Sequence, residues 1–457
     1  MTQTKSTATP APAAGTAPRV PLSLNQQFLR SFDKGPEDGA FGHRHTLVGG
    51  WRLRGPVDTA RLRAGLDAVV HRHEALRTEI VADDDGGHQV VRPAGPVTLT
   101  EVHLPADGDR DTAAEEYLNT VDASVFPVAE RPHLRAHLGR FSPEDAVLVL
   151  ATHHTSTDAW SLQVIARDLL AAYGDPDAAP AEPPVPYREF ALAQQSGSGS
   201  DPVRRARAYW QSRLGGAPIT GLATDRPHEE RTPADYGVER FVLGRDLSTG
   251  TTARARAVRG TPFMVLAAAY TVLLRERTGA GDVVFPTFSA GRWEERYAHA
   301  VGPFFNFLPI RVDTRDCATY GDVLTRTRTA CLGAYQHEIP FAHVAEDSPG
   351  LLAPFADPGL AVAAFEMLQA PFGADGPAAE GGPSVAEIRR RTLSQRVSSA
   401  IPNGALWALD LLADGELVGS LKFDHSRWDR ETVVGLLAGF TRHLEITARA
   451  PETELPH

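Results

Sequence analysis

Cysteine and long apolar runs are scarce in this chain of 457 residues, and each scarcity excludes a class of protein. The two cysteines, Cys317 and Cys331, are too few for a disulfide framework or a cysteine-based zinc site, and they are typical of a reducing compartment. The chain contains no run of roughly eighteen apolar residues, and residues 1–17 contain no hydrophobic block that could serve as a signal peptide. The sequence therefore predicts a cytoplasmic protein without a membrane partner.

Positive charge is also in deficit, because 46 Lys and Arg stand against 57 Asp and Glu, for a formal net charge of −11. A surface that binds nucleic acid needs clustered basic side chains, and the chain has no long basic run. We therefore expect no nucleic-acid partner. Only Lys5, Lys34 and Lys422 are lysines. The preference for arginine, together with the abundance of Ala, Gly and Pro, is typical of GC-rich coding, and no function is inferred from it.

Helix and strand patterns alternate along both halves of the chain. Apolar residues at helical spacing predict helices over residues 57–70 and 162–170. A nearly all-apolar helix is predicted to begin at the cap Thr261 and Pro262 and to end before Gly279. The short apolar runs at 146–151 and 283–288 are typical of buried strands. This alternation predicts an α/β or α+β protein.

Hydrophobic residues make up 42% of the chain, which is enough for one large domain or two medium ones. Residues 1–18, rich in Thr, Ala and Pro, predict a disordered tail. Residues 176–186 contain a cluster of prolines that sustains neither a helix nor a central strand, so we interpret them as a linker. The predicted division is an N-terminal lobe of residues 19–175 and a C-terminal lobe of residues 187–457.

The segment ATHHTSTDAWS at residues 151–161 concentrates polar groups at the end of a predicted buried strand. Successive strand side chains point to opposite faces, so only one of His153 and His154 faces a given cleft. An imidazole suits general acid/base chemistry at neutral pH, and the Asp158 carboxylate could fix its tautomer or hold the loop through an ion pair. We expect one catalytic and one structural histidine.

Other interpretations of this segment remain open from the residues alone. A pair of adjacent histidines is more often structural or solvent-exposed than catalytic. A zinc site needs a third ligand at a defined spacing, and none is near, so no metal is predicted. A serine nucleophile is not favoured, because the chain has no GxSxG elbow.

The HHTSTDAWS segment resembles the HHxxxDG motif of nonribosomal peptide synthetase condensation domains, and the resemblance extends over roughly residues 19–449. The further segments that are similar to motifs of this family, in the family's order, are PLSLNQQFL (21–29), RHEALRT (72–78), YWQSRL (209–214), DRP (225–227), TPFMVLAAAYTVLL (261–274), GR (291–292), VGPFFNFLP (301–309) and HEIPF (337–341). So many ordered matches make a chance resemblance improbable.

The resemblance implies a fold and an activity. The fold would be two chloramphenicol-acetyltransferase-like lobes in a V-shaped pseudo-dimer with a tunnel between them. The activity would be that of an acyltransferase in natural-product biosynthesis, antibiotics included. It would join an acyl or aminoacyl group, tethered to a peptidyl carrier protein, to an alcohol or amine acceptor through an ester or amide bond. No cofactor is expected on the chain itself, because the phosphopantetheine arm of the partner carrier protein presents the donor.

The resemblance also implies roles for individual residues. His154, the second histidine, would be catalytic and His153 mainly structural. Asp158 would pair with an arginine to hold the loop, and Arg292 is the predicted partner, with Arg77 as the alternative.

Three further residues are candidates for the substrate tunnel. Ser156 and Asn306 carry polar groups, although isolated residues of these types more often bond to local backbone. Ala159 replaces the glycine that closes the family motif, which adds a methyl group and removes easy access to positive φ. If the loop needs a left-handed backbone at this position, activity is expected to fall.

Two alternatives to a carrier-dependent enzyme stay open: a catalytically degenerate domain that recruits carrier proteins, and an acyltransferase that uses acyl-CoA. The second is weaker because the DFGWG segment of plant-type acyl-CoA transferases is missing. Epimerisation domains have a different signature in place of VGPFFNFLP, and heterocyclisation domains carry a DxxxxD pattern, so neither fits. No adenylation or carrier segment accompanies the matched region, so we expect a freestanding enzyme with a diffusible acceptor.

Overall fold

The structure is a computed structural model. It describes residues 19–33, 35, 39–83, 86–174, 182–227, 235–368, 376–377, 382–388, 393–396, 404–412 and 414–456. The predicted disordered tail (1–18) and residues 176–181 of the predicted linker lie outside the described residues. Among the described residues no single helix is both long and apolar enough to cross a membrane.

The described elements alternate helices and strands, as the sequence predicts. The helices are α1 (Leu24–Arg30), α2 (Thr59–Arg72), α3 (Arg110–Asp122), α4 (Ala159–Gly174), α5 (Tyr187–Gly197), α6 (Asp201–Leu214), α7 (Arg245–Ala257), α8 (Pro262–Thr278), α9 (Tyr320–Gln336), α10 (Phe341–Asp347) and α11 (Arg430–Arg449). The strands are β1 (Val20–Pro21), β2 (Thr46–Arg54), β3 (Thr78–Val81), β4 (His88–Val91), β5 (Thr98–His103), β6 (Leu134–Ser142), β7 (Asp145–His153), β8 (Leu222–Ala223), β9 (Tyr236–Leu243), β10 (Asp282–Ser289), β11 (Asn306–Asp313), β12 (Leu360–Leu368), β13 (Gly376–Pro377), β14 (Ser384–Glu387), β15 (Gln395–Arg396), β16 (Gly404–Leu411) and β17 (Leu417–Asp424).

Local sequence signals place several of these elements. The helix predicted over residues 57–70 is α2, whose first turn is capped by the Asp58 side chain. The buried helix is α8, which begins after the cap Thr261 and ends at Gly279, where φ is 71°. The apolar run at 146–151 lies inside β7, and every residue of that strand is buried.

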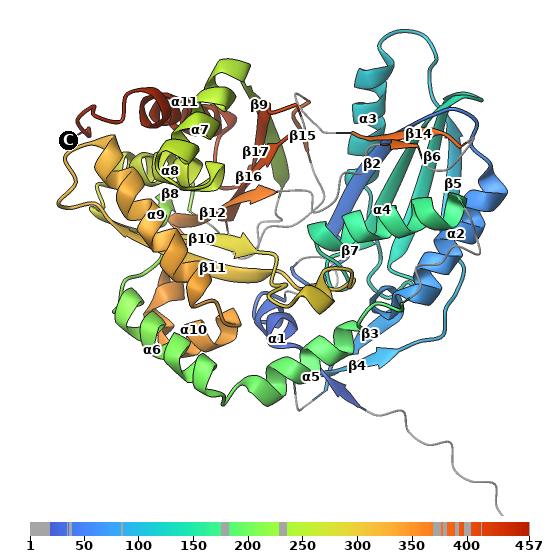
Figure 1. Cartoon of the computed structure of the whole chain (residues 1–457), viewed down its shortest axis with the longest axis horizontal. Coiled ribbons are helices and arrows are strands. Elements are labelled where there is room, and N and C mark those ends of the chain that lie inside the picture. The colour runs from blue at the N-terminus through green and yellow to red at the C-terminus, as the bar shows by residue number, and fades with distance from the viewer. Residues whose placement is uncertain are drawn as a thin grey trace, which may run out of the picture.

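The N-terminal sheet has the strand order β13-β14-β2-β7-β6-β5 (Figure 1). β7 is central and pairs antiparallel with both β2 and β6. Apolar side chains of α2 and α4 pack on one face of β7 and those of α3 on the other. Both faces are covered, which explains why β7 has a continuous apolar sequence rather than an alternating one.

The C-terminal sheet has the order β15-β9-β17-β16-β12-β8, and the parallel pair β12 and β16 lies within it. The largest cluster of buried apolar residues lies on one face of this sheet, against α8 and α11. β10 and β11 form a separate antiparallel pair, in which Ser289 lies opposite Asn306. This pairing places the end of β10 beside the start of β11.

The two halves exchange segments. β14 comes from the second half of the chain but pairs with β2, so that Ala386 lies opposite Arg52. Tyr297 and Phe304 likewise pack in the N-terminal core. The described residues therefore depart from the predicted C-terminal lobe of residues 187–457, because parts of it complete the N-terminal half. Figure 1 shows α5 and α6 running along one side of the molecule from one half to the other.

Candidate active site

His153 is the last residue of β7 and points into the protein body. Its side chain is fully buried, and its Nε2 atom lies 2.9 Å from the carbonyl oxygen of Gly42. A carbonyl only accepts, so Nε2 carries the hydrogen and Nδ1 accepts from the hydroxyl of Thr155 at 2.8 Å. Burial lowers the pKa of His153 to about 4. His153 is therefore neutral at physiological pH, and both of its ring nitrogens are occupied by structural bonds.

His154 has a different set of bonds. Its Nδ1 atom lies 2.9 Å from the carbonyl oxygen of Thr157, so Nδ1 donates and Nε2 keeps its lone pair. The half-buried imidazole stacks on His45, with ring centroids 4.6 Å apart, and the ring of Phe305 packs beside it with its centroid 4.5 Å away. The main-chain N–H of His154 donates to the His45 carbonyl at 2.8 Å. These contacts fix the orientation of the ring.

The surroundings of His154 favour its neutral form. Burial lowers its pKa most, and the positive charge of Lys422 on β17 lowers it further. The negative charge of Asp158 and the bond to Thr157 act in the opposite direction. A neutral imidazole with a free Nε2 lone pair is able to accept a proton from a substrate.

Asp158 holds the loop between β7 and α4. Its carboxylate forms a two-point ion pair with Arg292, with N–O distances of 2.7 and 3.0 Å, and both side chains are at most 5% exposed. It also accepts from the main-chain N–H groups of Ser161, at the start of α4, and Phe304. The ion pair that the sequence predicts between Asp158 and Arg292 is therefore present.

Arg77, the alternative partner, lies elsewhere: its guanidinium donates to the main-chain oxygen of Arg92 at 2.7 Å. Glycine is required beside the true partner, because Gly291 has φ of 62° and a Cβ there would lie 1.9 Å from the Phe304 oxygen. The GR segment thus brings Arg292 to the loop through a close backbone approach that only glycine permits.

Residues remote in the sequence position Phe305, whose ring packs against His154. Asn25 in α1 donates to the main-chain oxygens of Phe304 and Phe305 at 2.8 and 2.9 Å. The hydroxyl of Tyr187 donates to the Pro303 oxygen at 3.0 Å and lies 2.7 Å from the hydroxyl of Ser23. The PLSLNQQFL and VGPFFNFLP segments therefore act together to position Phe305 against the imidazole.

The RHEALRT segment helps to position α4, the helix that follows the histidine loop. His73 and Arg72 both bond to the buried carboxylate of Asp168 in α4, at 2.8 and 3.0 Å. This fixes α4 against α2 and so fixes the helix that Asp158 precedes.

Two of the tunnel candidates, Ser156 and Asn306, make hydrogen bonds inside the fold. Ser156 is 3% exposed and its hydroxyl lies 2.5 Å from Nδ1 of His133. Asn306 is 2% exposed and ties the start of β11 to the HEIPF segment, donating to the Ile339 oxygen at 2.9 Å and accepting from the Phe341 N–H at 3.0 Å. The fold therefore uses the polar groups of Ser156 and Asn306 internally, and a place for these residues in a substrate tunnel stays a prediction.

Ala159 is exposed and is the first residue of α4. Among the described residues other than glycine, positive φ occurs at Arg259 and not at Ala159. The loop therefore does not require a left-handed backbone where the family motif has glycine, and alanine fits the helical conformation without strain.

Sequence reasoning missed two residues that act on the imidazole. His45 precedes β2 in no recognised motif, and only the pairing of Thr46 with His153 brings it there. Lys422 belongs to the other sheet, and its charge lowers the pKa of both His45 and His154. The rarity of lysine in this chain was the one signal that singled out Lys422.

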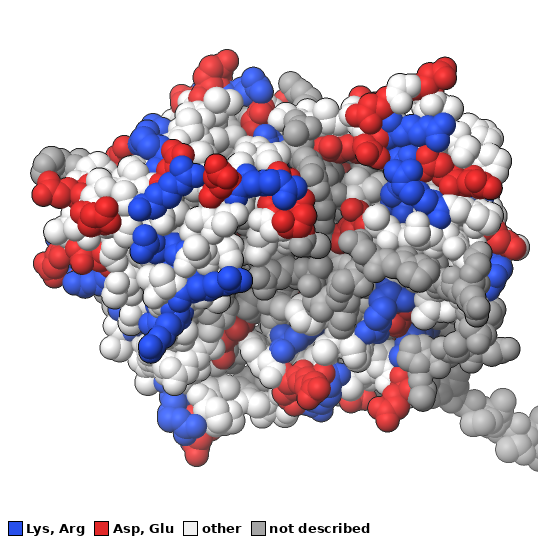
Figure 2. Space-filling view, turned by 45° about the horizontal axis from the view of Figure 1, so that its top comes forward, with Lys and Arg blue, Asp and Glu red and all other residues white. Residues whose placement is uncertain are grey.

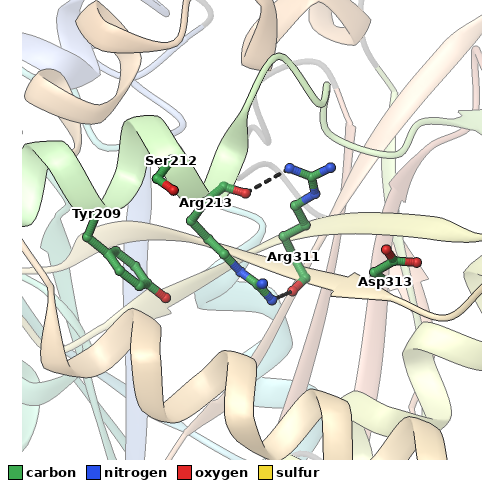
Figure 3. Close-up of a pocket in the computed structure, with 5 residues that line it drawn as sticks. All are labelled: Tyr209, Ser212, Arg213, Arg311 and Asp313. Carbon is green, nitrogen blue, oxygen red and sulfur yellow. Dashed lines mark hydrogen bonds between the residues drawn. The ribbon is translucent and has the colours of Figure 1, made fainter. Parts of the chain in front are cut away.

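A separate pocket of about 340 Å³ lies between α6 and β11 (Figure 3). It is lined by Tyr209, Ser212, Arg213, Arg311 and Asp313, and the two arginines bond to each other's main-chain oxygens. Arg311 lies about 17 Å along β11 from Asn306. Asn306 follows Phe305, whose ring packs against His154. This pocket is therefore not part of the histidine site.

The fold and this site define a class of protein: a chloramphenicol-acetyltransferase-like α/β protein with an HHxxxD loop between two sheets. The family model for the Condensation domain matches residues 47–456, and the chain belongs to that family.

Among its relatives, the chain is 38% identical over 344 residues to a probable non-canonical nonribosomal peptide synthetase, CymA, of Salinispora arenicola, and 31% identical over 337 residues to the phosphinothricin tripeptide synthetase PhsC of Streptomyces viridochromogenes. Each match covers 72% of this chain, but only 4% of the first relative and 31% of the second.

Two solved structures have the same fold as this chain. The SgcC5 protein from Streptomyces globisporus, in complex with (R)-(-)-1-(2-naphthyl)-1,2-ethanediol and sucrose, is 39% identical, with a TM-score of 0.90, and the match covers 95% of this chain and 100% of that one. The X-domain from teicoplanin biosynthesis has the same fold at 24% identity, with a TM-score of 0.75 over 98% of this chain and 99% of that one.

Proposed function

We propose that this protein transfers an acyl or aminoacyl group from the phosphopantetheine thioester of a peptidyl carrier protein to a hydroxyl group of a small alcohol, forming an ester. The observation that carries the proposal is the bonding of His154, whose Nδ1 is committed to Thr157 while Nε2 keeps its lone pair. The choice of an alcohol is supported by the aryl ethanediol bound to the 39% identical SgcC5 protein.

The reaction needs little from the protein beyond positioning and one proton transfer. A thioester carbonyl is already activated, so the hydroxyl oxygen attacks it while Nε2 of His154 accepts the hydroxyl proton. The tetrahedral intermediate then collapses, the carbon–sulfur bond breaks, and the imidazolium returns the proton to the leaving thiolate. The products are the ester and the free thiol, so atoms and charges balance.

The contacts around His154 suit this role. His45 and Phe305 hold the imidazole ring in one orientation, with ring centroids 4.6 and 4.5 Å away. The low pKa that burial imposes keeps the base unprotonated before attack. His153 has no free nitrogen, so the proton transfer is assigned to His154 alone.

The test offers one acyl group in two forms, on a phosphopantetheinylated carrier protein and on coenzyme A, together with 1-(2-naphthyl)-1,2-ethanediol or the matching amino alcohol. Products are identified by mass spectrometry. We expect an ester from the carrier-bound donor. Efficient turnover of the coenzyme A thioester without a carrier would overturn the carrier requirement, and amide as the main product would overturn the alcohol. Binding of the acylated carrier without any product would replace the enzyme with a recruitment domain.

A further inference from the structure

The HEIPF segment joins α9 to α10, and its acidic residue, Glu338, has no part in the mechanism so far. Glu338 is half-buried, and a single atom of its carboxylate, Oε1, accepts two hydrogen bonds. One comes from the hydroxyl of Ser289 and the other from Nδ2 of Asn306, at 3.1 Å. Ser289 ends β10, Asn306 begins β11, and the two lie opposite each other in the strand pair. One oxygen of Glu338 therefore bridges the two strand ends.

Residues 290–305 connect these two strand ends and reach the proposed base. The last residue of the connection, Phe305, directly precedes Asn306, and its ring packs beside the imidazole of His154, with ring centroids 4.5 Å apart. Phe305 also contacts Phe288 of β10, with ring centroids 6.0 Å apart. The bridge between the strand ends therefore lies one residue away from the aromatic ring that touches the base.

The bridge holds a carboxylate away from water. Burial raises the pKa of Glu338, and the hydrogen bonds from Ser289 and Asn306 oppose this rise. A carboxylate oxygen with little access to water needs hydrogen-bond donors, and here each strand end supplies one. The carboxylate therefore favours the arrangement in which both strand ends stay close to it, and so restricts the connection that ends in Phe305.

We propose that Glu338 is a positioning residue, which fixes the ends of β10 and β11 so that Phe305 holds the imidazole of His154 in the orientation for proton transfer. This inference rests on the proposed function and adds a residue to its machinery. Glu338 acts through Asn306 and Phe305, not by touching the reacting atoms. Its effect can be large, because a displacement of about 1 Å in an active site can cost about a hundredfold in rate.

Two substitutions separate the acceptor oxygen of Glu338 from its charge. Glu338→Gln keeps an oxygen that can accept from both Ser289 and Asn306, because both bond to the same atom, whereas Glu338→Met removes the acceptor. In steady-state assays we expect Glu338→Met to lower kcat about ten- to a hundredfold and Glu338→Gln to stay within a few-fold of the wild type. KM for the alcohol should change little in either variant.

The matched control is Glu346→Met, which removes an acid that is 68% exposed on α10 and should leave kcat unchanged. Equal losses of kcat in Glu338→Gln and Glu338→Met would show that the charge matters and not the bridge. That result, an unchanged kcat in Glu338→Met, or a rise in KM alone would overturn the proposal.

A double-mutant cycle tests whether Glu338 acts through Phe305. Phe305→Leu and Glu338→Met should each lower kcat, and the double variant should be little slower than the slower single variant, because both substitutions disturb the same contact. Losses that multiply in the double variant would refute this route.

Nuclear magnetic resonance separates this inference from the proposed function, because it needs no substrate. The ring current of Phe305 shifts the signal of the Cε1 hydrogen of His154, which is assigned by its absence in His154→Ala. The signal should move in Glu338→Met and in Phe305→Leu, and should stay in place in Glu338→Gln and Glu346→Met. If no ester forms from any donor, the proposed function fails, yet this pattern would still support the positioning role.

A signal that stays in place in Glu338→Met would contradict that role. If Glu338→Met does not fold, Ser289→Ala replaces it, because it removes one of the two donors and leaves the carboxyl group in place. The signal should then move in the same direction by a smaller amount, and an unmoved signal would count against the bridge.

Discussion

The two six-stranded sheets use their faces differently. Both faces of β7 in the N-terminal sheet are covered by helices, and all nine of its residues are buried. In the C-terminal sheet, the face that carries Trp407 packs on α11, and the opposite face combines buried residues such as Val238 and Val418 with the half-buried Glu366 and Lys422. His154, the proposed base, therefore follows a strand whose residues are all buried, whereas Glu366 and Lys422 come from a face that is only partly buried.

This difference teaches which substitutions affect which property. Side chains at the end of β7 and in its loop are bonded internally, except for Nε2 of His154, so changes there alter either the base or the fold. Glu366 and Lys422 are half-buried and lie outside the apolar core, so we expect changes at these two residues to affect activity more than the fold. Figure 2 shows basic and acidic side chains interleaved over one face of the molecule, so the net negative charge is not gathered into one patch there.

His154→Ala is expected to have the largest effect on activity. Loss of the general base should reduce the rate of ester formation by about 10²–10⁴-fold, because no other imidazole nitrogen in the loop is free. The melting temperature should stay close to that of the wild-type protein, because the side chain makes one hydrogen bond to a carbonyl at the edge of the site. Single-turnover kinetics and differential scanning calorimetry check both expectations.

His153→Ala is the matched control. It should lower the stability of the fold, whereas His154→Ala should lower the rate of ester formation. His153→Ala leaves the buried Gly42 carbonyl without its donor, which costs about 1–3 kcal/mol, in addition to a cavity. Retained activity in His154→Ala, or a larger loss of stability there than in His153→Ala, would contradict the division of roles.

Asp158→Ala tests the buried ion pair that holds the loop after β7. Removing one partner of a buried ion pair leaves the Arg292 guanidinium buried without its counter-charge, so we expect a loss of about 3–5 kcal/mol in the free energy of unfolding. Urea denaturation followed by circular dichroism measures it. The control is Glu445→Gln, which breaks a 3.6 Å pair with Arg449 whose members are about half exposed, and which should cost less than about 1 kcal/mol.

The pH dependence of activity tests how the charges of Asp158 and Lys422 act on the His154 imidazole. In the proposed mechanism His154 works while neutral, so the rate should fall as the pH drops through its pKa. Lys422 lowers this pKa and Asp158 raises it. Lys422→Met should therefore move the acid limb of kcat/KM to higher pH, and Asp158→Asn should move it to lower pH. The profiles are measured with a mono-alcohol acceptor, and shifts in the same direction would refute the electrostatic assignment.

Ala159→Gly should have the smallest effect. Alanine already adopts the helical conformation at the start of α4, so glycine relieves no strain and lowers helix stability by at most about 1 kcal/mol. Product formation should stay within a few-fold of the wild-type rate. A large gain in activity would show that the methyl group at this position obstructs the substrate.

Much of the fold could be predicted from local patterns. The continuous apolar run of β7 and the cap signals of α8 depend only on neighbouring residues, and both elements are found where predicted. The Asp158–Arg292 pair was also predicted, since two charged residues in recognised segments leave few alternatives. Segment exchange was not predicted, because the pairing of β14 with β2 joins residues that lie more than three hundred positions apart.

The sequence by itself determined the α/β class, the strand that ends in two histidines, and the family to which those residues belong. Only the tertiary structure decided what each polar group does. It buries Ser156 and Asn306 in internal bonds, it commits Nδ1 of His154 to a carbonyl, and it lets the charge of Lys422, on the other sheet, lower the pKa of His154. The reason is physical: periodicity and capping act between neighbours in the chain, whereas a hydrogen-bond partner or a nearby charge depends on where the packed sheets place residues that are remote in sequence.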